Sequence, residues 1–263
     1  MILVLGATGS TGRRVTEALR AAGHDVRAAS RSGETTFDWS DRGTWEAAVS
    51  GASAVYLMAP DGTPVDPGFV SLAVERGVER VVLLSSGGIE AMGDERLLAA
   101  ERTVRRSGAA WTILRPSWFN QNFDEGFLQP AIIAGEVLLP LGDTRQAFVD
   151  ATDIAAVAAA ALTEDGHAGR TYEITGPGSL SFGEAVAIIS RSIGREVRYL
   201  GGDEDYIAGN GFSGAAIQAA KAFSALRDLG DQPVLDTVDE VTGRPPKSFE
   251  TYAEQAAAGD AWH

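Results

Sequence analysis

The first half of the chain alternates short, largely apolar runs with longer segments in which apolar and polar positions recur at helical spacing. The apolar runs have the length of buried strands, and they predict strands at Ile2–Leu5, Val26–Ala29, Ala54–Leu57, Val81–Leu84 and Trp111–Leu114. Strands that alternate with helices indicate βαβ units and hence a parallel sheet. Strands that are apolar throughout are typical of a sheet covered by helices on both faces.

Helix-length segments lie between these strands and continue, less regularly, into the second half. We predict helices at Arg13–Ala22, Thr44–Val49, Phe69–Arg76, Glu95–Arg106, Asp153–Leu162, Phe182–Ile193, Ala215–Leu226 and Phe249–Ala257. Two further strands are predicted at Thr171–Ile174 and Val197–Leu200, and the many glycines of Gly201–Gly214 predict a mobile segment. No linker marks a domain boundary, so we expect residues 1–263 to form one domain.

These elements predict an α/β fold, a Rossmann-type doubly wound parallel sheet with a small C-terminal substrate-binding lobe. The lobe is expected to be built from about 118–145 and 177–263, over the carboxyl edge of the sheet. Ligands of doubly wound sheets bind at that edge. The sequence therefore predicts that the site lies between the sheet and the lobe.

Composition and charge narrow the function. The chain has 263 residues, no cysteine and a net charge of −14. The absence of cysteine excludes disulfides, Cys-ligated zinc and a thiol nucleophile, and no histidine has metal-ligand spacing, so we expect no metal site. The negative charge opposes binding to nucleic acid or an anionic membrane. The longest apolar run, Ile154–Leu162, is too short to span a bilayer.

The same features set expectations for location and assembly. No basic region precedes the apolar start of the chain, so we expect no signal peptide. We expect a cytoplasmic protein, as a monomer or homodimer, without nucleic-acid or membrane partners.

A glycine loop follows the first strand and opens the first helix: Gly6-Ala7-Thr8-Gly9-Ser10-Thr11-Gly12. In such a loop Gly6 permits the tight turn, Gly9 lets the backbone approach a pyrophosphate, and Gly12 allows close packing of helix and strand. The helix N-terminus then offers free N–H groups and partial positive charge to the anion. We predict a dinucleotide site here, contacted by the three glycines and by Thr8, Ser10 and Thr11.

The end of the second strand predicts which dinucleotide binds. It carries Arg31 and no acid, whereas an acid would be needed to bind the 2′-hydroxyl of NAD. Guanidinium groups bind phosphate through paired hydrogen bonds, and Arg13 and Arg14 can reach the same corner. The sequence therefore predicts NADP(H) in preference to NAD(H). Asp38 is either an adenine contact or a turn residue, and we also place Met58 at the cofactor.

The chain resembles the NmrA-like group of atypical short-chain dehydrogenases/reductases, nearly end to end and most weakly after Gly201. The residues that carry the resemblance are the glycine loop, Arg31, the Val81–Leu84 strand with Ser85-Ser86-Gly87-Gly88, Glu101, Ser107-Gly108, Thr112–Phe123 and Phe148–Ala155. The resemblance implies the fold and the NADP(H) cofactor. The group includes NADPH-dependent quinone, triphenylmethane-dye and ergot-alkaloid iminium reductases, and also regulators that bind the dinucleotide without turnover.

One departure from the wider superfamily concerns catalysis. Aligned on Glu101, the tyrosine and lysine of the usual Tyr-x-x-x-Lys pair fall at Gly93 and Leu97. Two interpretations follow. Either the substrate accepts hydride without a strong acid, as a quinone, iminium ion or cationic dye does, or hydride transfer does not occur.

The remaining candidate residues follow the ends of two strands. Ser85 either hydrogen-bonds the substrate, as the catalytic candidate, or ends the strand in a turn. The pocket wall is assigned to Ser86, Trp118, Phe119, Asn120 and Phe123. Aromatic side chains there favour a small aromatic or polycyclic substrate. The leading hypothesis is an NADPH-dependent reductase of such a compound; the alternatives are a dinucleotide-sensing regulator and a non-redox cyclase or isomerase.

Overall fold

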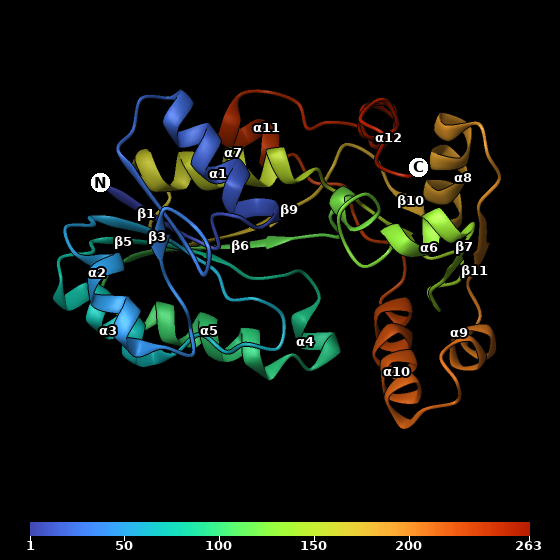
Figure 1. The fold of residues 1–263 in the computed structure, drawn as a ribbon, viewed down its shortest axis with the longest axis horizontal. Helices are drawn as coiled ribbons and strands as arrows, with labels where there is room; N and C mark the ends of the chain where they lie inside the picture. Colours follow the sequence, from blue (N-terminus) through green and yellow to red (C-terminus); the bar gives the residue numbers. More distant parts are fainter.

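The computed structural model describes the side chains of residues 1–214 and 216–263, and Ala215 by its backbone. The central sheet has seven parallel strands in the order β3-β2-β1-β4-β5-β6-β9 (Figure 1). They are β1 (Ile2–Leu5), β2 (Val26–Ser30), β3 (Thr35–Thr36), β4 (Ala54–Leu57), β5 (Arg80–Leu84), β6 (Ala110–Pro116) and β9 (Arg170–Ile174). The order reverses between β1 and β4, and a doubly wound sheet binds ligands outside that point. The predicted fold class is confirmed.

Helices cover both faces of this sheet, as its apolar strands predicted (Figure 1). One face carries α2 (Trp45–Val49), α3 (Pro67–Glu75) and α5 (Glu95–Arg105), and the other carries α1 (Ser10–Ala21), α7 (Ala151–Thr163) and α11 (Thr237–Thr242). Successive residues of β1 alternate between the two cores: Leu3 and Leu5 belong to the first, Ile2 and Val4 to the second. Among the helices of the described residues, none is long and apolar enough to cross a membrane.

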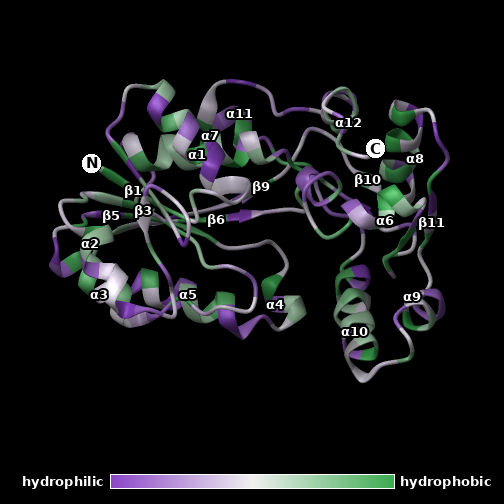
Figure 2. Cartoon of the chain, viewed as in Figure 1, coloured by the Kyte–Doolittle hydropathy of each residue, from purple (hydrophilic) through white to green (hydrophobic). Residues whose placement is uncertain are grey.

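Segments beyond the carboxyl edge of the sheet form a small lobe with a core of its own. Its elements are α6 (Gln129–Ala134), β7 (Glu136–Leu138), β8 (Arg145–Gln146), β10 (Leu180–Ser181), α8 (Phe182–Ile193), β11 (Arg198–Leu200), α9 (Asp203–Gly209), α10 (Gly214–Asp228) and α12 (Phe249–Ala258). The rings of Phe148 and Phe182 meet edge to face, with centroids 4.9 Å apart. Figure 2 shows the apolar positions of α8 that contribute to this core.

The structure differs from the predicted elements at two places that bear on the site. The first helix begins at Ser10 and not at Arg13, with Gly9 as its N-cap, so the helix N-terminus lies inside the glycine loop. Helix α9 occupies part of the segment predicted to be mobile. Its first turn carries three acidic residues, which favour a helix N-terminus, and Asp203 pairs with Arg227 of α10 at 2.7 Å.

Short elements complete the connections near the site. A 3₁₀ turn, η1 (Arg42–Thr44), precedes α2, and α4 (Ile89–Met92) follows β5. A second 3₁₀ turn, η2 (Asn120–Asn122), follows β6 and leads the chain into the small lobe. The connections after β5 and β6 therefore leave the sheet at its carboxyl edge, where the cavity described below opens.

Candidate functional site

The glycine loop lies between β1 and α1, where the strand order reverses. Gly6 has a φ of +65°, which favours glycine, and the Gly9 N–H donates to the Gly6 carbonyl oxygen at 2.8 Å. A Cβ on Gly12 would lie 2.2 Å from the same oxygen, so only glycine fits that position. Because Gly9 has no side chain, a ligand can approach the N-terminus of α1 directly. The loop is a cradle of the kind that binds a diphosphate.

The end of β2 also fits a phosphorylated dinucleotide. The Ser30 hydroxyl is buried and, among the described residues, has no hydrogen-bond partner. Arg31 beside it is exposed, and none of the ion pairs of the described side chains includes it. Asp38 accepts hydrogen bonds from the Ser40 hydroxyl and N–H at 2.7 and 2.8 Å, and these bonds lower its pKa. Arg31 is therefore available to a phosphate, whereas Asp38 is engaged within its own turn.

The carboxylate of Glu125, which the sequence analysis did not select, contacts side chains of the first two turns of α1. Glu125 accepts from the Ser10 hydroxyl at 2.7 Å and from Arg14 at 2.7 Å, and it also pairs with Arg13. Burial acts to raise the Glu125 pKa, but the hydrogen bonds from Ser10, Arg13 and Arg14 outweigh it, so the pKa is lowered. Arg13 and Arg14, two of the three arginines considered for the phosphate, are thus paired with the Glu125 carboxylate.

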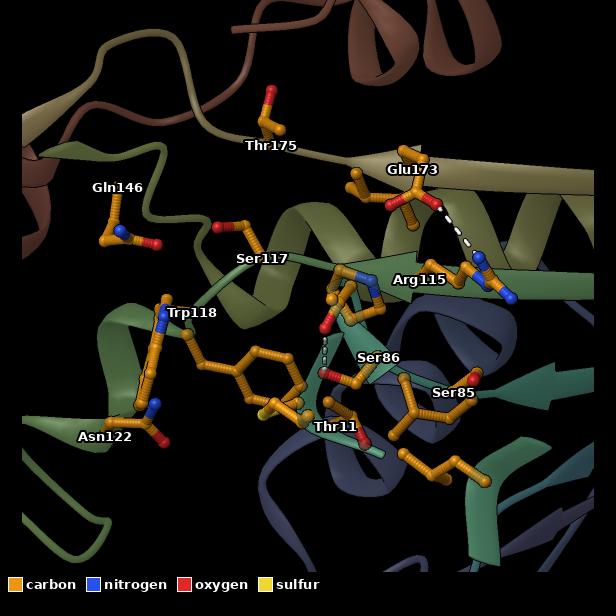
Figure 3. A pocket seen from close by; sticks show the side chains of 18 of the residues that line it. Thr11, Ser85, Ser86, Arg115, Ser117, Trp118, Asn122, Gln146, Glu173 and Thr175 are labelled. Atoms are coloured by element: carbon orange, nitrogen blue, oxygen red, sulfur yellow. Dashed lines mark hydrogen bonds and ion pairs between the residues drawn. The ribbon is translucent and has the colours of Figure 1, made fainter. Parts of the chain in front are cut away.

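A cavity of about 670 Å³ opens between the glycine loop and the small lobe (Figure 3). The predicted site residues that line it are Ser10, Thr11, Met58, Ser85, Ser86, Trp118 and Phe119. The wall also contains Asn122, which follows the same strand as Trp118, and residues that the sequence did not assign to the site: Arg96, Arg115, Phe127, Gln146, Glu173, Thr175, Leu226, Leu229 and Pro233. Because the cavity begins at the glycine loop, a dinucleotide held there can extend into it.

Two predicted wall residues lie outside this cavity. Phe123 is fully buried in the small-lobe core, against Phe148 and Phe249. Asn120 is also fully buried, and its amide atoms have no hydrogen-bond partner within the described chain. The aromatic wall instead consists of Trp118 and Phe119, joined by Phe127. The prediction missed Phe127 because its segment has no strand or helix periodicity that would orient it.

The Ser85 side chain belongs to a buried ionic network. Its hydroxyl donates to Glu101 Oε1 at 2.7 Å, and Glu101 is fully buried. Arg115 donates from Nε and Nη2 to the two oxygens of the same carboxylate, each at 2.8 Å, and Arg105 lies 2.9 Å from it. Since the hydroxyl hydrogen of Ser85 is committed to Glu101, Ser85 faces the cavity as a hydrogen-bond acceptor.

The structure also shows the two positions that align with the usual catalytic tyrosine and lysine, and neither has an ionisable side chain. Gly93 ends α4 with a φ of +63°, and Leu97 lines the cavity with its apolar side chain. In the part of the chain that the structure describes, no group of three or more histidine, aspartate or glutamate residues is arranged to hold a metal ion.

Comparisons with known proteins agree with this geometry. A family model described as NAD(P)H-binding matches residues 6–165. The chain is 33% identical to the NAD(P)H azoreductase of Xenophilus azovorans, over 98% of both chains. It is 36% identical to the (4-alkanoyl-5-oxo-2,5-dihydrofuran-3-yl)methyl phosphate reductase of Streptomyces griseus, again over 98% of both.

A solved structure, that of the NADPH-dependent quinone oxidoreductase of Escherichia coli in complex with NADPH, has a similar fold. The TM-score is 0.79 at 21% identity, over 97% of this chain and 99% of that chain. At this identity the likeness extends to the fold alone, whereas the sequence matches above identify the family. The chain therefore belongs to the NAD(P)H-binding family, which confirms its resemblance to the NmrA-like atypical short-chain dehydrogenases/reductases.

Proposed function

We propose that this protein is an NADPH-dependent reductase of a small, planar, electron-poor organic compound. The observation that carries the proposal is one cavity that runs from the glycine loop to an aromatic wall of Trp118, Phe119 and Phe127. NADPH, when bound, supplies the hydride. The relative named as an NAD(P)H azoreductase supports this reaction class.

The charges around the cavity favour a neutral or cationic substrate. Arg115 lines the wall, but carboxylates of Glu90, Glu101 and Glu173 lie 2.7, 2.8 and 3.5 Å from its guanidinium. Arg96 is paired with Asp94 at 3.3 Å. Since both cations are offset locally and the net charge is −14, an anionic substrate has little to attract it.

The side chains of the wall would act by positioning and by excluding water. The aromatic side chains can stack on a flat substrate, and the apolar Leu97 at the usual lysine position cannot lower the pKa of a neighbouring acid. Substrates that accept hydride readily are the ones that such a site can serve. This argument favours quinones, azo compounds, iminium ions and cationic dyes over simple ketones.

The test is NADPH consumption by the purified protein with a quinone, an azo dye, a cyclic iminium salt, a triphenylmethane cation and simple ketones. We expect consumption with the first four and little with the ketones. NADPH binding without consumption would favour the sensor alternative, and rearrangement of a compound without consumption would favour a cyclase or isomerase.

Cofactor preference is expected to depend on Arg31. A hydrogen bond between charged groups contributes about 1.5–3 kcal/mol, so Arg31→Ala should lower the NADPH-over-NADH affinity ratio roughly 10- to 100-fold. Titration of both cofactors into wild type and variant measures the ratio. Arg20→Ala, which removes an arginine already paired with Glu34, is the matched control. An unchanged ratio in the Arg31 variant would transfer the phosphate contact to Arg13 or Arg14.

The aromatic wall is tested with Trp118→Ala. Trp118 lines the cavity while packing edge to face on Phe182, with ring centroids 5.2 Å apart. Loss of stacking and of apolar contact should raise KM for planar substrates roughly 10-fold. Trp111→Ala is the control, because Trp111 lies at the amino end of β6, the strand that Trp118 follows, and is not part of the cavity wall. Equal KM values in both variants would assign Trp118 to packing alone.

A further inference from the structure

Glu173 is one of the three glutamates whose carboxylates surround Arg115, and it differs from the other two in its position at the cavity. Residues 115 and 173 are register partners on the parallel strands β6 and β9, and Arg115 Nη1 lies 3.5 Å from Glu173 Oε1. Glu101, on the other side of the guanidinium, is fully buried, whereas the Glu173 side chain is 49% exposed. Figure 3 shows Glu173 above Arg115. Glu173 is thus the carboxyl of this network that forms part of the cavity wall.

The space in front of this carboxyl is left open by Gly87. A Cβ on Gly87 would lie 3.6 Å from Glu173 Oε2, in direct contact with the carboxyl oxygen. Gly87 follows Ser85 and Ser86 at the end of β5, and all three line the cavity. A larger residue at position 87 would extend further against the carboxyl at this edge of the cavity. Its absence lets Oε2 face the residues where the substrate is proposed to bind.

The other polar groups nearby are poorly suited to release a proton. The Ser85 hydroxyl donates to Glu101, and the Arg115 guanidinium keeps its protons at all physiological pH values. Among the described residues, Asp61 is the other carboxyl of the wall, and it lies in the loop after β4, where no ion pair with a described residue holds it. Glu173 is held beside Arg115 on the sheet and is therefore the better-placed acid.

The surroundings of Glu173 also favour its protonated form. Burial raises its pKa, the charge of Arg115 on β6 opposes that effect, and the carboxylates of Glu90 on α4 and Glu101 on α5 raise the pKa further. The balance is a raised pKa. A general acid works best when its pKa approaches the working pH.

We propose that Glu173 is the proton donor for those substrates whose reduction takes up a proton together with the hydride. The inference rests on the proposed reductase function. In an azo compound, hydride forms one N–H bond and the N=N π bond breaks. The proton of Glu173 then forms the second N–H bond, giving a hydrazine and NADP⁺, and the carboxylate takes a new proton from solvent. A triphenylmethane cation needs the hydride alone, since the product is already neutral.

This difference between substrates supplies the experiment. In Glu173→Gln we expect kcat/KM for an azo dye or a quinone to fall roughly 100-fold, the usual scale of general-acid catalysis. The same variant should reduce a triphenylmethane cation at the wild-type rate. For the azo dye, wild-type kcat/KM should fall as pH rises through the Glu173 pKa, and this limb should be absent from the variant.

Two further variants act as controls. Glu95→Gln removes an exposed carboxylate of α5 that pairs with Arg102, outside the cavity wall and away from Arg115, and it should keep both activities. Glu173→Asp retains the acid and should recover part of the azo and quinone activity. The split between substrates in Glu173→Gln is not expected from a merely structural role, because misfolding or displacement of Arg115 would impair both substrate classes.

Several outcomes would overturn the proposal. Equal losses with both classes would make Glu173 a structural residue, and unchanged rates with both would remove it from the reaction. A split found in Asp61→Asn and not in Glu173→Gln would assign the proton to Asp61. If the wild type reduces the cation and neither proton-requiring substrate, Glu173 has no such role although the reductase function stands. If the wild type reduces no compound, the proposed function itself fails.

Discussion

Replacing Gly9 with valine is expected to abolish NADPH binding. The Gly9 position caps α1, and its Cβ would already lie 3.2 Å from the Gly6 carbonyl oxygen, so a branched side chain must point into the space of the diphosphate. Each hydrogen bond lost from a charged phosphate removes about 1.5–3 kcal/mol, and the loss of two lowers affinity at least about 100-fold. Fluorescence or calorimetric titration with NADPH measures the effect.

The control for this prediction is Gly178→Val. Gly178 has open space where a Cβ would lie, with no other atom within 4 Å among the residues the structure describes. This variant carries the same substitution away from the loop and should bind NADPH as the wild type does. Thermal unfolding of both variants separates a lost site from a lost fold. A folded Gly9→Val protein with unchanged NADPH affinity would show that the cofactor does not use this loop.

Replacing Glu101 with glutamine is expected to lower the free energy of unfolding substantially. Glu101 is fully buried, accepts hydrogen bonds from Ser85 and Arg115 and forms an ion pair with Arg105, and the Arg115 side chain is only 14% exposed. Breaking a buried ion pair costs about 3–5 kcal/mol, and the counter-charges that remain to Arg115 are the more exposed carboxylates of Glu90 and Glu173, so we expect a loss toward the lower end of that range. Urea unfolding at neutral pH measures this loss. Glu95→Gln is the matched control on the same helix, because its pair with Arg102 is exposed and such pairs contribute at most about 1 kcal/mol.

The pH dependence of this difference follows from the Glu101 pKa. Burial acts to raise the pKa, but hydrogen bonds from Arg115 and Ser85 and the charges of Arg115 and Arg105 outweigh it, so the folded-state pKa lies below its ordinary value of 4.5. The ionised carboxylate therefore stabilises the fold above that value, and this stability is lost as pH falls through the lower, folded-state pKa. The gap between wild type and Glu101→Gln should narrow in acid. A gap of equal size at neutral and acidic pH would contradict the ionic origin of the effect.

Local signals in the sequence were sufficient for the sheet and the glycine loop. The central strands β1 and β4 are apolar throughout because both of their faces are buried, and this property is visible without knowledge of any contact partner. Gly6 and Gly12 are required by a positive φ and by the approach of Gly12 to the Gly6 carbonyl oxygen, both within seven residues. Constraints that act over so short a distance appear directly in the order of residues.

The ion pairs around the cavity could not be predicted from local signals in the sequence. Glu125 meets Ser10 across 115 positions of sequence, and Glu173 meets Arg115 because β9 returns beside β6 after the chain has passed through part of the small lobe. A surface glutamate and a site glutamate look the same in the sequence. The difference between them is made by what lies within a few ångströms after folding.

In the segment that forms the aromatic wall, the sequence predicted the aromatic residues, and the tertiary structure determined which of them face the cavity. The sequence placed Trp118, Phe119 and Phe123 together at the end of β6, where an aromatic wall was expected. The η2 turn then directs Trp118 and Phe119 toward the cavity and Phe123 into the small-lobe core, while the exposed Phe127 joins the wall. By itself the sequence determined the fold, the geometry of the glycine loop and the presence of aromatic residues after β6, since these depend on local backbone geometry and on burial. Only the tertiary structure decided which side chains line the cavity and which carboxylates surround Arg115, because those contacts depend on how distant segments pack.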